Sequence, residues 1–394
     1  MIGRNIRKTL MELSSQMPVI ALVGPRQAGK TTLAKLTFRE HAYVSLENLE
    51  NRNFAHSDPL QFLERHRNSS GIIIDEFQHV PTLISYIQNH VEKQSVKGQF
   101  ILIASENFLH SSSITQGLSG HMALVTLLPL CISELDKEGL LPNSIEEAVF
   151  KGSYPHLYSE FVSPTIFYPN YILTYVERDV RHMSNISDPA TFKLFVQLCA
   201  GRIGQVLNTT TLAQDCGISI PTAKSWLKLL EDSYVIFQLP AYKSSFGKRA
   251  VKSPKIYFYD TGVACSLLGI ENPSQAATHY LFGALAESYV ISDFIKYHYN
   301  RARTPQIYFW KDNHGHEMDC IIVQSTRVCA LDIKAGKTIS EQYTKGLNYW
   351  KALTRENPTT SFVVYMGSEY MPTTAGTILG WKSIDRITTP PSEY

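Results

Sequence analysis

Residues 24–31 read GPRQAGKT and have the spacing of a phosphate-binding loop. Glycines at both ends let the backbone curl, so that successive N–H groups and the start of the next helix face a phosphate. Lys30 would then reach the β- and γ-phosphates of a nucleotide, and Thr31 would offer its hydroxyl to Mg²⁺. The alternative is a glycine turn that only caps a helix. The apolar strand expected before the loop favours the phosphate site.

Two acidic residues end the next apolar run, where residues 71–74 (GIII) are followed by Asp75 and Glu76. Asp75 is placed to hold the magnesium through its water shell, and Glu76 to polarise an attacking water, which implies hydrolysis. The alternative is that Asp75 and Glu76 only cap a helix. Ser105 or Asn107, after the third apolar run, is predicted to help orient that water, and an ordinary turn signal explains them equally well.

A second set of charged residues lies near the C-terminus. Period-2 alternation in ALDIK places Asp332 and Lys334 on one face of a strand, while Asp319 belongs to another strand and Glu287 to a helix. Three carboxylates make an all-oxygen Mg²⁺ site, with Glu287, Asp319 and Asp332 as ligands, and Lys334 can stabilise negative charge or orient water. The alternative is an exposed Asp–Lys pair with a capping Glu nearby.

The elements that must position the first site follow from apolar runs. Uniformly apolar stretches over 19–23, 71–74 and 100–104 alternate with longer mixed segments, and an amphipathic stretch over 33–38 follows the glycine loop. Short buried strands of this kind are typical of a parallel sheet covered on both faces. We therefore predict an α/β P-loop NTPase domain over residues 1–150.

A change of pattern near residue 151 marks a predicted boundary, followed by a helix over 171–182. Residues 209–239 then offer a short helix, a glycine turn and a second helix, and the runs VIFQL and KIYFY look like strands of a wing. This order resembles a winged helix-turn-helix, so residues 151–275 are predicted as a helical linker with that module. The outward helix positions and the wing cations would contact DNA phosphates: Thr222, Lys224, Ser225, Lys228, Lys243, Lys248, Arg249, Lys252 and Lys255. The alternative is a protein-contact or lid module.

Residues 276–394 show the order helix, three strands, helix, strand. With the carboxylate cluster, this order resembles the PD-(D/E)XK, or restriction-endonuclease-like, nuclease fold, in which those positions cut phosphodiesters. The resemblance implies catalytic roles for Asp319, Asp332 and Lys334, although Asp332 takes a place often held by Glu. A degenerate domain that binds DNA without cutting it is a further alternative.

The motifs GPRQAGKTTL, IIIDEFQHVP, GSYP, YVERDV and YFYDTGVACSLLG together resemble AAA-type ATPases with a C-terminal domain of formerly unknown function, the AAA_14/DUF4143 architecture. The resemblance implies ATP and Mg²⁺ as cofactors, Asp75 and Glu76 in the Walker B position, and a nucleotide-binding segment formed by Gly24, Pro25, Arg26, Gln27, Ala28, Gly29, Lys30, Thr31 and Thr32. His121 stands where family members commonly have an arginine that acts on a neighbour's γ-phosphate. His121 therefore argues against fast hydrolysis in a homo-oligomer. Arg178 and Arg181 are candidate substitutes as phosphate sensors, and the alternative is that they form intrahelical pairs or face solvent.

Composition sets outer limits. The chain has 394 residues, 44% hydrophobic and 18% charged, which is typical of a globular protein of two or three domains. The net charge of +2 means that DNA contact must come from local patches. Six single cysteines form no C-x-x-C pair, and a zinc site from His314, His316 and Cys320 is disfavoured because Cys320 should point away from Asp319. No stretch approaches the roughly 18 apolar residues of a membrane span, so we expect a cytoplasmic protein without a membrane partner.

Two hypotheses follow. In the first, an ATP-hydrolysing AAA-type protein uses its nucleotide state to position a winged helix and a nuclease-like domain on DNA. In the second, a slow ATP-dependent switch assembles with protein partners, and its C-terminal domain is a non-catalytic scaffold. Both predict ATP binding, and only the first predicts DNA cleavage.

Overall fold

The computed structural model describes residues 2–94, 96–105, 118, 120–180, 186, 188–242, 251–324, 327–354 and 361–388, without the side chains of 178 and 179. The chain forms two compact units: residues up to 130 with 232–234 and 298–304, and the remaining residues. The three-part division at 150 and 275 stays a prediction. No described helix is both long and apolar enough to cross a bilayer.

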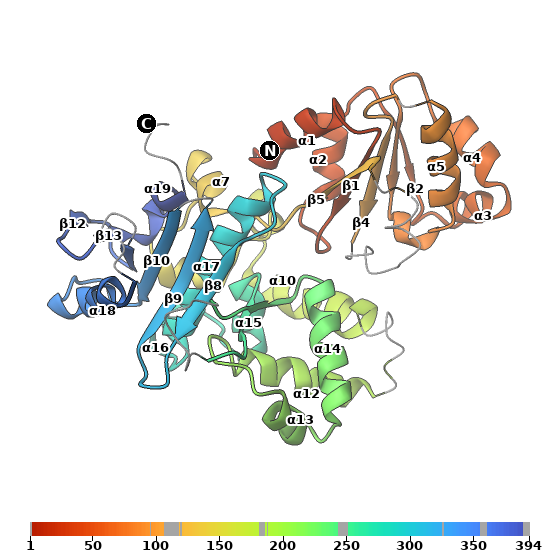
Figure 1. The fold of residues 1–394 in the computed structure, drawn as a ribbon. Helices are drawn as coiled ribbons and strands as arrows, with labels where there is room; N and C mark the ends of the chain where they lie inside the picture. Colours follow the sequence, from red (N-terminus) through yellow and green to blue (C-terminus); the bar gives the residue numbers. More distant parts are fainter. Residues whose placement is uncertain are drawn as a thin grey trace. The chain divides into compact units, whose positions relative to one another are not determined.

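The first unit is built on a five-stranded, wholly parallel sheet (Figure 1). Its order is β2-β3-β4-β1-β5, with β1 Val19–Val23, β2 Ala42–Ser45, β3 Ile72–Asp75, β4 Phe100–Ala104 and β5 Met122–Thr126. The predicted α/β class with a parallel sheet is confirmed. Strands β2 and β5 were not predicted. Strand β2 (AYVS) lacks the uniformly apolar pattern of the inner strands, whereas β5 (MALVT) is largely apolar and was overlooked.

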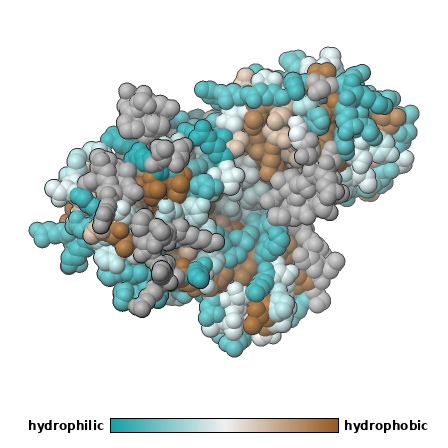
Figure 2. Space-filling view, in the orientation of Figure 1, coloured by the Kyte–Doolittle hydropathy of each residue, from teal (hydrophilic) through white to brown (hydrophobic). Residues whose placement is uncertain are grey.

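Helices cover this sheet, and the apolar faces of α1 and α2 join its core through Ile6, Leu10 and Leu33. The helices are α1 Ile6–Ser14, α2 Lys30–Thr37, α3 Leu49–Ser57, α4 Pro59–His66 and α5 Leu83–Lys93, with a 3₁₀ turn at Phe77–His79. Figure 2 shows a mostly hydrophilic surface over α3, α4 and α5, as expected for helices that bury one face only.

The second unit begins with helices α7 Ile132–Lys137, α8 Ile145–Lys151, α9 His156–Ser159 and α10 Pro164–Tyr171, and a π-helical segment, Ile172–Val180, continues α10. The helix predicted over 171–182 therefore starts earlier. Pro164 occupies its first turn, where the missing N–H costs nothing, and the Ser163 side chain accepts a hydrogen bond from the Thr165 N–H.

A helical pair and a hairpin follow. Helices α12 Pro189–Ala200, α13 Thr209–Cys216 and α14 Ile220–Asp232 precede the antiparallel strands β6 Ile236–Leu239 and β7 Lys255–Phe258. Asn208 caps α13 by accepting from the N–H groups of Thr210 and Thr211. These elements match the predicted order, and the winged-helix assignment itself stays a prediction.

The C-terminal part contains a six-stranded mixed sheet ordered β12-β13-β11-β10-β9-β8. The elements are α15 Thr261–Leu267, α16 Pro273–Thr278, α17 Phe282–Tyr299, β8 Ile307–Lys311, β9 Glu317–Gln324, β10 Arg327–Lys334, α18 Lys345–Thr354, β11 Ser361–Tyr365, β12 Tyr370–Pro372, β13 Thr377–Gly380 and α19 Asp385–Thr388. Strands β8, β9 and β10 are antiparallel neighbours, and β10 and β11 are parallel. The likeness to a nuclease fold stays a prediction.

Two motifs quoted above meet in a buried hub. The Asp260 carboxylate accepts from the Ser153 N–H at 2.7 Å, the Tyr168 hydroxyl at 2.7 Å and the Gly262 N–H at 2.9 Å. It also accepts from the Ser153 hydroxyl, to which Lys296 Nζ donates at 3.0 Å. Because donors surround the buried carboxylate, GSYP and YDTG join parts of the fold here.

Candidate functional site

The glycine loop lies between β1 and α2, as the sequence predicts. Gly29 has a left-handed backbone (φ 92°) and immediately precedes α2. The Lys30 ammonium is buried and donates to the carbonyls of Gly24 and Pro25, both at 2.8 Å. Burial lowers the pKa of Lys30 to about 8, while Glu76 and Asp75 act in the opposite direction. The cation is thus held within the loop by main-chain oxygens, close to where the loop's N–H groups would face a phosphate.

Two contacts hold this loop against neighbouring backbone. Gly24 has φ 144°, and a Cβ there would lie 2.1 Å from the Leu127 carbonyl oxygen. Arg4 donates to the Ala28 carbonyl at 2.7 Å and to the Leu128 carbonyl at 2.6 Å. Arg4 could not be recognised from the sequence, because a lone arginine before the first helix belongs to no motif.

The metal-binding pair predicted from Thr31 and Asp75 is brought together. Thr31 Oγ1 donates to Asp75 Oδ2 at 2.7 Å, and the Tyr43 hydroxyl donates to the same oxygen at 3.0 Å. Burial, followed by the neighbouring Asp75 charge, raises the pKa of Tyr43 to about 12. The hydroxyl and the carboxylate oxygen are ligand types that suit Mg²⁺, so these side chains fit the ion. Tyr43 was missed because its strand, β2, was not predicted.

Glu76 follows β3 with a left-handed backbone (φ 53°). Its Oε1 accepts from the Ser105 hydroxyl at 2.7 Å, and its Oε2 accepts from Gln78 Nε2. Ser105, at the end of β4, therefore contacts the predicted water-activating group, whereas Asn107 lies outside the described residues. Both carboxylate oxygens are engaged in this conformation.

Two further residues near Glu76 were not singled out from the sequence. Glu47, Glu76 and His79 each offer one ligand atom, and these atoms lie within 4.8 Å of one another. Within the described part of the chain, no other set of three His, Cys, Asp or Glu side chains meets this criterion. Of these two residues, only His79 could have been noticed in the sequence, because it lies three positions after Glu76 and residues at this spacing share one face of a helix.

The other predicted nucleotide-site residues take varied positions. Pro25 and Ala28 are buried, Arg26 is half-buried, and Gln27 and Thr32 are exposed. Gln27 also has a left-handed backbone, with φ 63°. His121 is half-buried, and its carbonyl accepts from the Val19 N–H at 3.2 Å. The Arg178 side chain and the whole of Arg181 lie outside the described residues.

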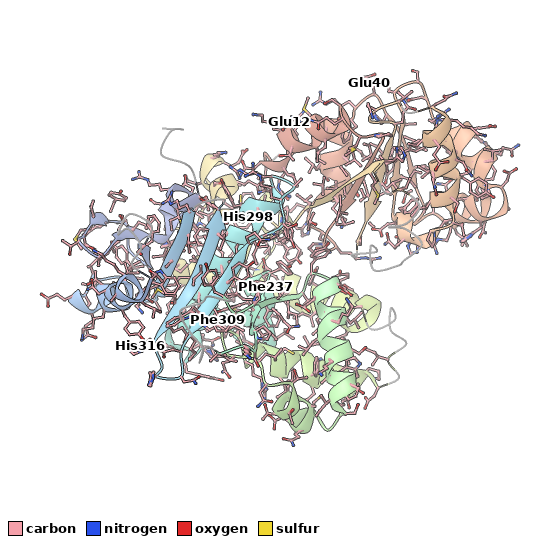
Figure 3. The ribbon with its side chains drawn as sticks, viewed as in Figure 1. Glu12, Glu40, Phe237, His298, Phe309 and His316 are labelled. Carbon is pink, nitrogen blue, oxygen red and sulfur yellow. The ribbon has the colours of Figure 1, made fainter. Side chains whose placement is uncertain are left out.

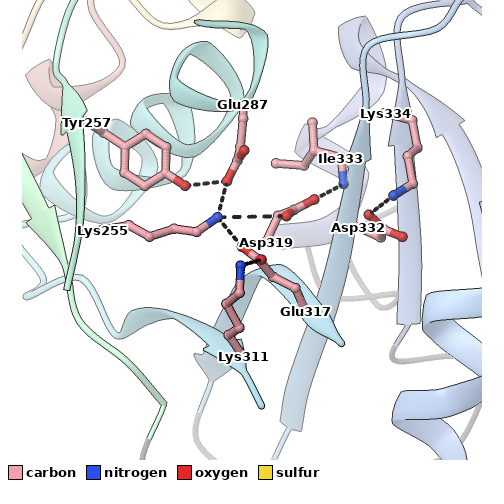
Figure 4. Close-up of polar contacts among 9 residues, drawn as sticks. All are labelled: Lys255, Tyr257, Glu287, Lys311, Glu317, Asp319, Asp332, Ile333 and Lys334. Carbon is pink, nitrogen blue, oxygen red and sulfur yellow. Dashed lines mark hydrogen bonds and ion pairs between the residues drawn. The ribbon is translucent and has the colours of Figure 1, made fainter. Parts of the chain in front are cut away.

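The C-terminal cluster is also brought together, but around a lysine (Figure 4). Lys255 Nζ lies 3.0 Å from Glu287 Oε1 and 4.0 Å from Asp319 Oδ1, and it pairs closely with Glu317 Oε1. Burial opposes the charge of Lys255, but the three carboxylates outweigh burial and raise its pKa. Burial and then Asp319 raise the pKa of Glu287 to about 8.

The remaining predicted members lie on β9 and β10. Lys334 Nζ contacts Asp332 Oδ1 at 2.5 Å, which confirms that the two side chains share a face. Asp319 Oδ2 accepts from the Ile333 N–H at 2.8 Å. Burial, then the Asp319 charge, raises the pKa of Asp332 to about 7.

The predicted metal role of Glu287, Asp319 and Asp332 does not fit this arrangement. Their ligand atoms do not gather as those of Glu47, Glu76 and His79 do, and a lysine ammonium lies among the carboxylates. Lys255, predicted as an outward cation of the wing, is instead buried, with a side chain only 4% exposed. Spacing alone could not show that Lys255 lies beside Glu287, since residues 255 and 287 belong to distant elements.

Helix α14 presents the predicted outer face. Lys224, Ser225 and Lys228 are exposed and Thr222 is half-buried, whereas Ala223, Trp226, Leu227 and Leu230 are buried. Among the predicted wing cations, Lys252 is exposed, and Lys243, Lys248 and Arg249 fall outside the described residues.

The zinc alternative gains no support from geometry. Figure 3 shows His316 at the turn between β8 and β9, where its Nδ1 contacts Asp312 Oδ2 at 2.9 Å. Cys320 is fully buried within β9. In the described part of the chain, these side chains do not form a set of metal ligands.

Three family models match successive parts of the chain. Residues 16–136 match an AAA domain (AAA_14), residues 142–274 a domain of unknown function (DUF8612), and residues 282–384 a domain of unknown function (DUF4143). The AAA match supports ATP binding.

Relatives and solved structures add little about activity. An uncharacterized protein of Mycobacterium tuberculosis is 28% identical over 342 residues, covering 86% of this chain and 75% of the relative, and one from Mycobacterium bovis gives the same values. A Walker-type ATPase of Pyrococcus abyssi is 16% identical, covering 68% of this chain and 96% of that one, with a TM-score of 0.44.

Proposed function

Since the chain carries an AAA domain at residues 16–136 and a DUF4143 domain at residues 282–384, we propose that it is a slow, ATP-dependent switch that contacts DNA through α14. The supporting observation is that four predicted residues lie at the carboxyl ends of β1 and β3: Lys30, Thr31, Asp75 and Glu76. In the parallel sheet, only β4 lies between these two strands. Open α/β sheets bind ligands at such an edge.

Each residue would have a distinct task. Lys30 would exchange its two carbonyl contacts for the phosphate oxygens of ATP, and the loop N–H groups would hold the same phosphates. Thr31 and Asp75, already in contact at 2.7 Å, would hold Mg²⁺. Bound Mg²⁺ would neutralise phosphate charge. Glu76 would take a proton from the attacking water or orient that water.

Slow turnover follows from the contacts of Glu76. Ser105 and Gln78 each donate to one oxygen of the Glu76 carboxylate and would hold it in this orientation, which would restrict how it meets an attacking water. His121 adds to this expectation, because it replaces the arginine that the family resemblance would place there. An arginine finger typically contributes about 10³–10⁵ in rate.

Lys30→Ala and Glu76→Gln test the nucleotide site. Lys30→Ala should abolish ATP binding in calorimetry while circular dichroism stays unchanged. Glu76→Gln should keep ATP affinity and lower turnover roughly a hundredfold. ATP binding by folded Lys30→Ala at the wild-type affinity would remove the proposed site, and wild-type turnover in Glu76→Gln would remove the role of Glu76.

Gln78→Ala tests the restraint on Glu76. Freeing one carboxylate oxygen should raise basal ATP turnover several-fold, with ATP affinity unchanged. The matched control is Gln88→Ala, since Gln88 makes an exposed hydrogen bond to Glu92 within α5 and its loss should leave turnover unaltered. Equal turnover in both variants would show that Gln78 does not limit the reaction.

A further inference from the structure

We infer that the ammonium of Lys255 takes the place of the divalent cation in the carboxylate cluster of the C-terminal domain. The cluster then fastens the β6–β7 hairpin to α17, β9 and β10, and it does not bind Mg²⁺ or Mn²⁺. This inference concerns the second unit only and is independent of the proposed ATP site.

The position of Lys255 is the first argument. Its Nζ contacts Glu287 from α17 and both Glu317 and Asp319 from β9, so three carboxylates from two elements surround one ammonium. An ammonium offers three donors and one positive charge, which suits such a set. Mg²⁺ needs oxygen ligands at about 2.0–2.1 Å in octahedral geometry, including the carboxylates that bind it. It could not share this space with the ammonium.

The predicted ligands also have donors other than Lys255. Glu287 accepts from the Tyr257 hydroxyl, and Asp319 Oδ2 accepts from the Ile333 N–H at 2.8 Å. Asp332 pairs with Lys334 at 2.5 Å. Figure 4 shows these donors reaching the carboxylates from different elements. Each predicted metal ligand therefore already has a protein donor.

The charged groups of the cluster also favour a lysine over a metal ion. The cluster holds the four carboxylates of Glu287, Glu317, Asp319 and Asp332, and Lys255, Lys311 and Lys334 supply three ammonium groups. Lys311 Nζ lies 2.6 Å from Glu317 Oε2. Buried carboxylates are stable only when cations or hydrogen-bond donors lie beside them, and the three lysines fill that role here.

The connection explains what the cluster does for the fold. Lys255 is the first residue of β7, whose partner β6 begins only four residues after α14 ends at Asp232. Tyr257, on the same strand, also bonds to Glu287. The hairpin that follows α14 is thus fixed by two side chains to the helix and sheet of the C-terminal domain.

Manganese binding to the full chain without nucleotide tests the inference. Paramagnetic resonance of free Mn²⁺ would compare the wild type with Asp319→Asn, and we expect identical binding, because the C-terminal cluster contributes none. Lys255→Met should gain about one Mn²⁺ per chain, and Lys255→Met with Asp319→Asn should lose it. One Mn²⁺ more in the wild type than in Asp319→Asn would overturn the inference.

A second readout does not depend on the lysine variant. Supercoiled plasmid incubated with Mg²⁺ or Mn²⁺ should be cut no faster by the wild type than by Asp319→Asn. Cleavage that Asp319→Asn abolishes would also overturn the inference. If circular dichroism shows that Asp319→Asn is unfolded, Glu287→Gln takes its place in both comparisons. The comparison of the wild type with Asp319→Asn tests the inference even if Lys255→Met does not fold.

Discussion

At the scale of single residues, the ionisation of Lys30 ties nucleotide binding to pH. Burial lowers its pKa to about 8, so the free protein carries the charge below pH 8 and loses it above. ATP would favour the charged form and raise that pKa. ATP affinity should therefore be constant up to about pH 8 and weaken about tenfold by pH 9, with proton uptake on binding. Calorimetry in buffers of different ionisation heat would measure both effects.

Lys30→Arg is the control for this pH dependence. Its guanidinium remains charged throughout the range, so its ATP affinity, weaker because of the changed geometry, should not fall between pH 8 and pH 9. A parallel fall in both proteins would assign the effect to another group.

At the scale of elements, the close approach of the glycine loop to the segment after β5 governs stability. A Cβ on Gly24 would meet the Leu127 carbonyl oxygen at 2.1 Å, so the backbone would have to move. Gly24→Ala should destabilise the first unit by roughly 3 kcal/mol or more. Urea unfolding followed by a probe in that unit would measure the loss.

Gly120→Ala is the matched control in the same unit. Gly120 also has a left-handed backbone (φ 82°), but among the described residues no atom lies within 4 Å of the added Cβ. Its cost should be about 1 kcal/mol, which reflects backbone strain alone. Equal losses in the two variants would mean that the contact with Leu127 has no effect.

At the scale of the whole molecule, a net charge of +2 gives little general attraction to DNA. Binding would depend on local cations, of which Lys224 and Lys228 are exposed on α14. Lys224→Ala with Lys228→Ala should weaken duplex binding and reduce the slope of log affinity against log salt by about 2. Fluorescence anisotropy at several salt concentrations would measure both quantities.

The exposed Lys8 on α1 supplies the control for DNA binding, since Lys8→Ala removes a surface charge elsewhere. It should leave the salt slope unchanged. If the double variant also keeps wild-type affinity and slope, the α14 module is better assigned to protein partners.

Much of the first site was accessible from sequence because its chemistry is local. Gly24, Gly29, Lys30 and Thr31 belong to one continuous strand, loop and helix, so spacing alone predicts their arrangement. Asp75 and Glu76 follow a uniformly apolar strand, which places them at the carboxyl edge of a parallel sheet. The positions of these side chains depend only on the strand, loop or helix that contains them.

Tertiary structure alone decided the partners that come from distant segments. Tyr43 reaches Asp75 from an unpredicted strand, and Arg4 reaches the Ala28 carbonyl from before the first helix. Lys255 also meets Glu287, which lies 32 residues later in the chain (287 − 255), and Asp319, which lies 64 residues later (319 − 255). The sequence identified the carboxylates, but only the fold determined which cations lie beside them, because buried acids need a nearby cation or donor and these lysines come from distant segments.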